Sequence, residues 1–229
     1  MTTIEADAKT AKGRDTRAKI LDAALALFRE KGYEETTMRA ISERAGVALG
    51  NAYYYYRSKE HLIQGFYETM YEEHVRIAGP GLGRKRDFKS RLAESMDALL
   101  EAIEPFHPFA GILFANAADP RSPLNPFSPE SEHVRTQAIS FYVNVIEGCK
   151  ERVPDDLRSA LPFLLWLHHM GIVLYWIHDN SPKRKKTHCL VGHTVDLVAQ
   201  LVRLASHPLM RPMRRRALGL LHELKHHPS

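Results

Sequence analysis

Residues 36–59 (TTMRAISERAGVALGNAYYYYRSK) bring together side chains of the types that bond to nucleic acids. An asparagine such as Asn51 can form two hydrogen bonds with adenine, and an arginine such as Arg39 can reach a guanine edge or a phosphate. Lysine and tyrosine side chains in the same stretch can bond to phosphate. For these side chains to reach base edges, they must lie on an element that fits a DNA groove. The local structure of this stretch decides whether they do.

The spacing within this stretch predicts two short helices joined by a tight turn. Thr36 or Thr37 can cap the first helix, because a threonine oxygen accepts from an unpaired backbone N–H. Gly46 lies where the chain must turn, and glycine tolerates positive φ. A second helix is expected over about residues 48–55. The buried face of the first helix comprises Met38, Ile41 and Ala45. This pattern is typical of a helix-turn-helix, whose second helix lies in the major groove.

The flanking residues predict one helix on each side of this motif. Residues 16–33 form an amphipathic pattern that ends before Gly32, and Ser58 can cap a long helix that runs to Ala78. The inward residues of the first flanking helix are Ile20, Ala23, Ala24, Leu27 and Phe28. We therefore expect a disordered arm over 1–13, a three-helix DNA-binding domain over 14–57 and a connecting helix over 58–78.

Residues 14–75 resemble the N-terminal domain of the TetR/AcrR family of transcriptional regulators. The matching residues are Ile20-Leu21-Asp22-Ala23-Ala24, Phe28, Lys31-Gly32-Tyr33, Thr36-Thr37, Ile41, Ala45-Gly46-Val47, Tyr53, Tyr55 and Ser58-Lys59-Glu60. The match departs from the family at Ala48, where a small polar cap is common, and at Leu49, where a polar or basic residue is common. Leu49 can contact a thymine methyl but cannot hydrogen-bond a base, so the resemblance carries no operator preference.

The resemblance implies a set of DNA contacts. By position in the family motif, Arg39 reaches a base or phosphate, the start of the second helix reads bases, and Lys59 holds phosphate. The set comprises Thr37, Arg39, Leu49, Gly50, Asn51, Tyr53, Tyr54 and Lys59. For Tyr55 and Tyr56 we favour core packing, since one face of a helix points inward. A basic arm with Lys9, Lys12, Arg14, Arg17 and Lys19 either adds phosphate contacts or has no site of its own.

The remainder of the chain, residues 79–229, predicts a second helical domain. The glycines and proline of residues 79–83 are expected to break the connecting helix. Helical patterns follow over 87–104, 108–118, 129–152, 155–179, 184–205 and 213–225, with a proline-rich loop at 119–129 that is a connector or a lid. No strand pattern is found, so the fold class is all-α. The helices at 155–179 and 184–205 are expected to pair into the intersubunit four-helix bundle of a homodimer.

Aromatic and polar residues embedded in these apolar helices predict a cavity for a small effector. The candidates are Tyr67, Met70, His74, Phe106, Phe109, Phe114, Asn116, Phe141, Asn144, Trp166, His169 and Trp176. Ordinary core packing is the alternative for each residue, and the two tryptophans can instead lie in the dimer bundle. By resemblance, the set implies a hydrophobic or aromatic effector.

Composition and charge limit which other classes of protein the chain can belong to. The net charge is +5, but residues 183–229 hold a surplus of eight positive charges, so the basic surplus lies far in sequence from the helix-turn-helix. We expect Cys149 and Cys189 to be free buried thiols. Without a signal peptide or an apolar run that spans a bilayer, a cytoplasmic protein with no membrane partner is expected. No metal-ligand cluster, nucleophile motif or phosphate loop is found, so we expect no cofactor, no metal and no enzyme.

The sequence therefore predicts a homodimeric DNA-binding regulator, most simply a repressor that a small effector releases from its operator. The alternatives are an all-α ligand-binding or enzymatic protein with a vestigial helix-turn-helix, and an activator without an effector.

Overall fold

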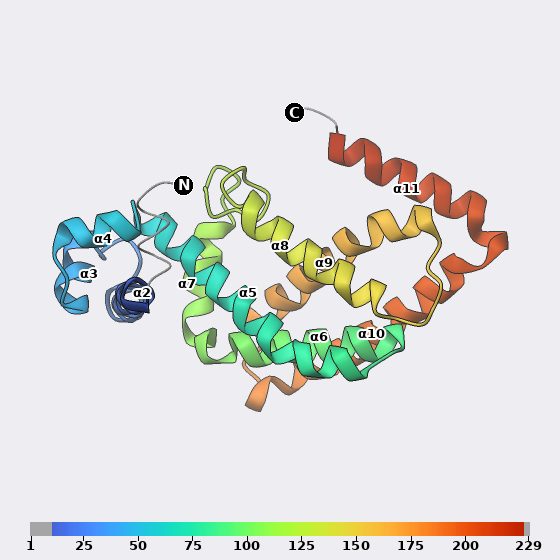
Figure 1. Cartoon of the computed structure of the whole chain (residues 1–229), viewed down its shortest axis with the longest axis horizontal. Helices are drawn as coiled ribbons and strands as arrows, with labels where there is room; N and C mark the ends of the chain where they lie inside the picture. The colour runs from blue at the N-terminus through green and yellow to red at the C-terminus, as the bar shows by residue number, and fades with distance from the viewer. Residues whose placement is uncertain (1–10, 227–229) are drawn as a thin grey trace. The chain divides into compact units, whose positions relative to one another are not determined.

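The computed structural model describes residues 11–226, and all secondary structure in this range is helical (Figure 1). The first elements are α2 (Ala11–Lys31), α3 (Met38–Ala45), α4 (Leu49–Tyr55), α5 (Lys59–Arg84), α6 (Phe88–Ile103), the 3-10 turn η1 (Glu104–Phe106) and α7 (His107–Ala117). They are followed by α8 (Glu132–Glu147), α9 (Asp155–His178), η2 (Pro182–Arg184), α10 (Lys185–Ser206), η3 (Pro208–Met210) and α11 (Arg211–His226). The all-α fold class is confirmed over these residues.

The chain divides into two compact units. Unit 1 contains residues up to Tyr71 together with Phe106–Arg135, and unit 2 contains Glu72–Pro105 together with the chain from Thr136 onward. The helices α5 and α8 contribute residues to both units. The expected division into 14–57, 58–78 and 79–229 follows the order of the sequence, whereas unit 1 also includes Phe106–Arg135, the segment around α7.

Unit 1 has an apolar core built from helices that are amphipathic in sequence. Ile20, Phe28 and Ile41 are fully buried in this core. Leu62 of α5 is also fully buried there. The ring of Phe109 from α7 stacks on Phe28 of α2, with the ring centroids 5.9 Å apart. The core thus holds the helix-turn-helix between elements that are far apart in sequence.

The loop between α7 and α8 is anchored on unit 1. Leu124 is buried in the core, and the carbonyl of Pro123 accepts hydrogen bonds from the hydroxyls of Ser128 and Ser131. The side chain of Gln64 on α5 donates to the carbonyl of Pro123 at 3.4 Å. These contacts favour a packed connector over a lid.

The connecting helix α5 does not break at residues 79–83, as its sequence predicted, but continues to Arg84 with Pro80 inside it. Arg91 of α6 caps the end of α5 by donating to the carbonyls of Leu82 and Lys85. A Cβ at Gly81 would lie 1.9 Å from the Glu94 carboxylate, so a larger residue there would have to displace that side chain. A capping side chain on the next helix has therefore overridden the local tendency of glycine and proline to end the helix.

Three further expectations need correction. Residues 11–13 belong to α2, whereas residues 1–10 of the expected arm lie outside the described residues. Cys149 is half-buried and Cys189 is exposed, so neither is a buried thiol. Two stretches, Phe88–Ala117 and Asp155–His178, are long and apolar enough to cross a membrane by length and composition, a test that the core helices of soluble proteins also pass.

Candidate nucleic-acid interface

The turn of the helix-turn-helix forms as its sequence predicts. Thr37 adopts an extended conformation and its hydroxyl accepts from the backbone N–H of Ala40 at 3.2 Å. Gly46 ends α3 in the left-handed region with φ of 67°, and its N–H donates to the carbonyl of Glu43. A side chain at this φ is strained, so glycine fixes the angle between α3 and α4.

The second helix, α4, is held by one face and leaves the other open. Ala52 is fully buried and Tyr56 is 3% exposed, whereas Gly50, Asn51 and Tyr53 are exposed. Ala48 supplies no side-chain cap. Its backbone carbonyl accepts from the N–H of Asn51 at 2.9 Å. The exposed face of α4 is therefore free of core contacts and has the residue types that read base edges.

The predicted DNA-contact residues fall into two groups. Those that lie exposed on the helix-turn-helix are Thr37, Arg39, Gly50, Asn51 and Tyr53. The partly buried ones are Leu49, Tyr54 and Lys59. Leu49 packs against the core of unit 1, and Tyr54 packs edge-on against Tyr55 with centroids 5.2 Å apart.

Lys59 has a structural contact that its sequence position did not indicate. Its Nζ donates to the carbonyls of Tyr33 and Glu34, at 2.7 and 3.3 Å, and lies 4.3 Å from the ring centroid of Tyr33. The ammonium therefore caps the segment that follows α2. Lys59 therefore contributes to the orientation of α5, and its ammonium adds positive charge to the candidate DNA interface.

The contact that fixes the end of α4 was missed in the sequence. Tyr56 accepts a hydrogen bond from Nε of Arg17 at 3.1 Å, and Nη2 of Arg17 donates to Glu68 at 2.7 Å. Burial raises the pKa of Tyr56 against the lowering effect of Arg17, so the hydroxyl stays protonated at neutral pH. The three residues link α2, the end of α4 and α5. Arg17, expected on a basic arm, is instead part of this link.

The absence of a side chain at Gly65 leaves space for the ring of Tyr56. A Cβ at Gly65 would lie 2.7 Å from Cε1 of Tyr56, so Gly65→Ala must displace the buried ring. We expect the free energy of unfolding to fall by about 1–3 kcal/mol, as overpacking does in other cores, and DNA affinity to fall with it. Thermal unfolding and a DNA titration measure the two effects.

Gly111→Ala on α7 is the matched control for that substitution, because nothing lies within 4 Å of a Cβ there. It is expected to raise stability by about 0.5–1 kcal/mol, the usual gain from replacing a helical glycine. Equal effects of the two substitutions would contradict the role of Gly65.

The predicted effector-pocket residues do not gather in one place. Tyr67, Met70, Phe106, Phe109, Phe114 and Asn116 belong to unit 1, and His74, Phe141, Asn144, Trp166, His169 and Trp176 belong to unit 2. In unit 1, Phe109 is core, Tyr67, Met70 and Phe106 pack on that core, and Asn116 bonds to the carbonyl of Ile112 in its own helix. Burial raises the pKa of Tyr67 to about 12.

In unit 2, the structure brings His74, Phe141 and His169 together. The Nε2 of His74 donates to the carbonyl of Ser95 at 2.8 Å, and the ring of His74 lies 4.5 Å from Phe141 and 5.9 Å from His169. The hydroxyl of Tyr142, which the sequence did not single out, bonds to Nδ1 of His169 at 3.0 Å. Burial lowers the pKa of His74 to about 4 and that of His169 to about 3. The cluster is thus neutral and polar within apolar helices.

Two other predicted pocket residues have different surroundings. Asn144 is exposed, and Trp176 is buried with its indole N–H donating to Glu104 at 3.0 Å. Trp166 is also buried. Core packing, the alternative for each residue, accounts for both tryptophans.

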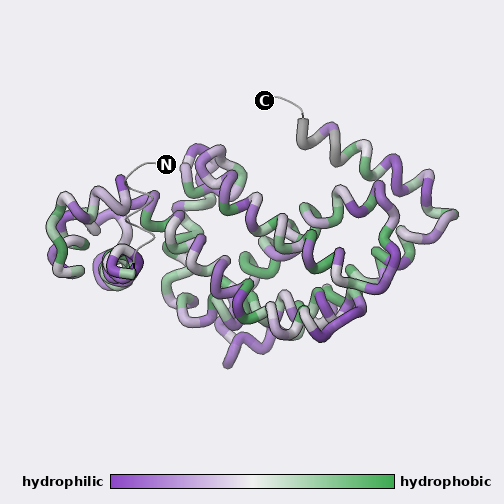
Figure 2. Tube along the Cα trace, viewed as in Figure 1, coloured by the Kyte–Doolittle hydropathy of each residue, from purple (hydrophilic) through white to green (hydrophobic). Residues whose placement is uncertain are grey.

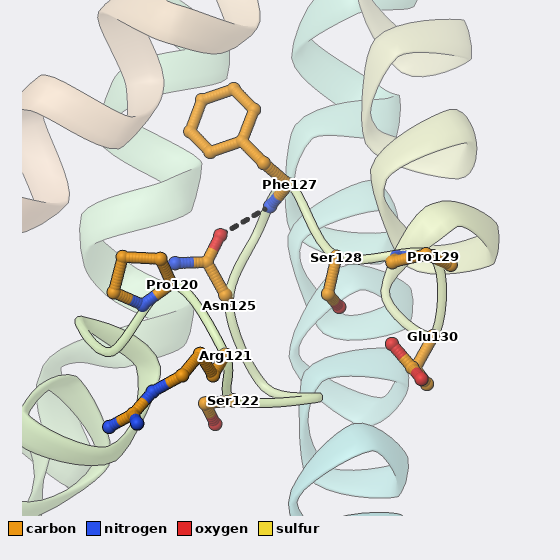
Figure 3. A pocket seen from close by; sticks show the side chains of 8 residues that line it. All are labelled: Pro120, Arg121, Ser122, Asn125, Phe127, Ser128, Pro129 and Glu130. Atoms are coloured by element: carbon orange, nitrogen blue, oxygen red, sulfur yellow. Dashed lines mark hydrogen bonds between the residues drawn. The ribbon is translucent and has the colours of Figure 1, made fainter. Parts of the chain in front are cut away.

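Surface hollows are found elsewhere in both units. One, in unit 1, is a surface cavity in the loop after α7, where Asn125 accepts from the N–H of Phe127 and the ring of Phe127 points away from Arg121 (Figure 3). Another, in unit 2, lies at the end of α9 beside Tyr175, His178 and Lys186. None of the predicted pocket residues lines either hollow.

The comparisons with known proteins agree with this architecture. The family described as "Bacterial regulatory proteins, tetR family" matches residues 20–65, and that described as "Tetracyclin repressor-like, C-terminal domain" matches residues 91–215. The HTH-type transcriptional repressor KstR2 of Rhodococcus jostii is 32% identical over 159 residues, which are 65% of this chain and 74% of KstR2. KstR of Mycolicibacterium smegmatis is 52% identical over 50 residues, and this match spans only 24% of KstR.

Solved structures share the fold. A TetR-family regulator from Syntrophomonas wolfei superposes with a TM-score of 0.66 at 20% identity, over 81% of this chain and 95% of that one. FadR from Bacillus subtilis in complex with stearoyl-CoA superposes with a TM-score of 0.61 at 16% identity, over 80% of this chain and 97% of FadR. With the two family matches and the KstR2 relationship, the conclusion is that the chain belongs to the tetR family of helix-turn-helix transcriptional regulators, which bind DNA and are not enzymes.

Proposed function

We propose that the protein is a cytoplasmic, homodimeric repressor that a hydrophobic effector releases from its operator. The observation that carries this proposal is the open face of the helix-turn-helix, where Arg39, Asn51 and Tyr53 are exposed while the opposite side chains are buried. Relatives named as repressors, KstR and KstR2, support the direction of regulation.

A dimer supplies the second recognition helix. Two copies of α4 are expected about 34–36 Å apart, or a multiple of one helical turn, on a pseudo-palindromic site. Large apolar side chains lie exposed on the two helices expected to form the bundle: Leu174 and Tyr175 on α9, and Leu197, Leu201 and Leu204 on α10. Exposed apolar surface of this extent is typical of a protein interface, and supports pairing through α9 and α10.

The effector is proposed to bind unit 2 near the neutral histidine cluster. The buried ring of Phe141 provides apolar surface, and the imidazole of His169, whose Nδ1 bonds to the hydroxyl of Tyr142, can donate its other N–H to a carbonyl or carboxylate. The stearoyl-CoA bound in the FadR structure makes a long-chain acyl thioester a sensible first probe. Binding would shift the two α4 helices out of register with the operator, at a coupling free energy of about 1–3 kcal/mol.

The test is a selection of genomic DNA fragments by the purified protein, followed by release with candidate effectors. Enrichment of one palindromic sequence, and its release by stearoyl-CoA or another hydrophobic compound, is expected. A compound that binds tightly and leaves operator affinity unchanged would exclude the coupling, and the absence of any enriched sequence would exclude the repressor.

Substitutions on the open face should weaken this complex. Arg39→Ala and Asn51→Ala are each expected to cost about 1–3 kcal/mol of binding free energy, and Asn51→Ala to relax discrimination at one base pair. Fluorescence-anisotropy titrations on the selected operator and on single-base variants measure both effects. Arg121→Ala removes an exposed arginine of the same unit, paired with Asp119, and should change affinity less than twofold. If Arg121→Ala weakened binding as much as Arg39→Ala, α3 and α4 would not be the reading surface.

A further inference from the structure

The end of the chain carries an unusual amount of exposed apolar surface. Eleven large apolar side chains are exposed among the described residues, and six of them fall between residues 197 and 220. These six are Leu197, Leu201 and Leu204 on α10, Leu209 on η3, and Met213 and Leu220 on α11. Most of α11 lies beyond residue 215, where the family match ends. The part of α11 that follows Arg215, which includes Leu220, is therefore outside the family match.

Among the described side chains of α11, that of Arg214 fixes the helix within unit 2. Nε of Arg214 lies 3.1 and 3.0 Å from the two carboxylate oxygens of Asp156, in the first turn of α9. The same guanidinium donates to the carbonyl of Ala205 in the last turn of α10. Arg214 also lowers the pKa of Asp156, so the pair stays charged at neutral pH. This anchor leaves the Met213 side of the helix uncovered.

The uncovered side has the spacing of a helix-packing seam. Met213, Ala217 and Leu220 follow one another by four and three residues and lie on one face of α11, about a quarter turn from Arg214. Met213 is 61% and Leu220 57% exposed. The exposed leucines 197, 201 and 204 of α10 repeat the same spacing of four and three. Alternation of apolar and polar residues along α11 is visible in Figure 2. Such a narrow seam suits a partner helix.

We propose that α11 clasps a second copy of this chain, extending the homodimer surface of α9 and α10 through Leu209, Met213 and Leu220. The inference presupposes the proposed homodimer. A stable interface takes about 20–30 residues from each partner, and the α9–α10 surface alone offers five exposed large apolar side chains. Arg214 joins α11 to Ala205 in the last turn of α10, next to the exposed Leu204, and the exposed Leu209 lies between the two helices, so the seam of α11 continues the α10 part of that surface.

An anionic membrane is the competing occupant, since Arg211, Arg215 and Arg216 are exposed on α11. Helices that lie in a bilayer surface usually present Trp or Phe on the apolar side, and α11 contains neither. The match in spacing between the seams of α10 and α11 favours the second copy.

The experiment measures dimer dissociation by sedimentation velocity over a dilution series of the full chain. Met213→Glu with Leu220→Glu is expected to raise the dimer dissociation constant at least tenfold and leave the circular dichroism spectrum unchanged. Leu209→Ser with Met213→Ser should act in the same direction without adding charge. Arg215→Gln, on the polar side of the same helix, is the matched control and should have no effect. Leu201→Glu on α10 tests the core of the dimer.

The outcomes separate the two proposals. A wild-type chain that is monomeric at all concentrations overturns the homodimer and the clasp together. If Leu201→Glu gives monomers while both α11 variants keep the wild-type dissociation constant, the dimer stands and the clasp is wrong. Co-sedimentation with vesicles of phosphatidylcholine and phosphatidylglycerol, lost in the α11 variants while the dimer is unchanged, would assign α11 to a membrane and overturn the clasp.

Discussion

Replacing Arg91 with methionine is expected to lower the free energy of unfolding by about 3–5 kcal/mol, because it removes a buried guanidinium that donates to four backbone carbonyls at the ends of two helices. The Arg91 side chain is buried, and its guanidinium donates to the carbonyls of Leu82, Lys85, Asn144 and Val145. These carbonyls terminate α5 and α8, where the helix dipoles favour a positive charge. One side chain of α6 thus holds the ends of two other helices.

Chemical denaturation and thermal unfolding would measure this loss, with a fall in midpoint temperature of about 10 °C for a chain of this size. Gly148→Ala should act on the same site, because a Cβ there would lie 2.1 Å from Nη2 of Arg91. Lys89→Met is the matched control on α6. It removes an exposed ion pair with Asp196, which is worth about 0–1 kcal/mol. A loss for Arg91→Met no larger than for Lys89→Met would contradict the capping role.

Acidification from pH 8 to pH 5 is expected to destabilise the protein through His74 by about 2 kcal/mol, since its pKa is about 4 in the fold against 6.5 in the unfolded chain. The sign follows from proton uptake. Below pH 6.5 the unfolded chain binds a proton that the buried imidazole does not, so stability is present at high pH and falls as pH decreases toward 4. The pKa of His169, which burial lowers to about 3, adds a loss in the same direction.

The contribution of His74 can be isolated by measuring the free energy of unfolding of variants as a function of pH. His74→Gln retains an N–H that can donate to the carbonyl of Ser95 but cannot titrate, so its slope between pH 8 and pH 5 should be flatter than that of the wild type. His193→Gln, at an exposed position of α10, should leave the slope unchanged. If the unfolding free energy of His74→Gln changed with pH as steeply as that of the wild type, acid would destabilise the protein through other groups.

The DNA-binding helices could be predicted from sequence because the signals that form them are local. The threonine cap at Thr37, the positive φ of Gly46 and the inward spacing of Ile20, Phe28 and Ile41 all lie within the segment that they shape. The departure at Ala48 was also recognised, and the structure has no side-chain cap there. Family resemblance and local physics agree over these residues.

The features that could not be predicted depend on partners in other helices, either the next helix or one far along the chain. Nothing near residues 79–83 indicates that Arg91 will cap α5, and nothing near Phe109 indicates that its ring will stack on Phe28. The candidate effector residues have aromatic or polar character within apolar helices, a property that core residues share. Phe109 and Trp176 proved to be core, and Asn144 exposed, for that reason.

The most direct test of DNA-binding regulation through α3 and α4 is an anisotropy titration of the purified protein against the DNA upstream of its own gene. It is run at two salt concentrations with an unrelated duplex as competitor. Saturable binding that survives the competitor, and that Arg39→Ala with Asn51→Ala removes, is the predicted result. Binding that disappears with salt and competitor, or that the double variant retains in full, would reflect phosphate attraction alone and would contradict the assignment of α4 as the reading helix for this DNA.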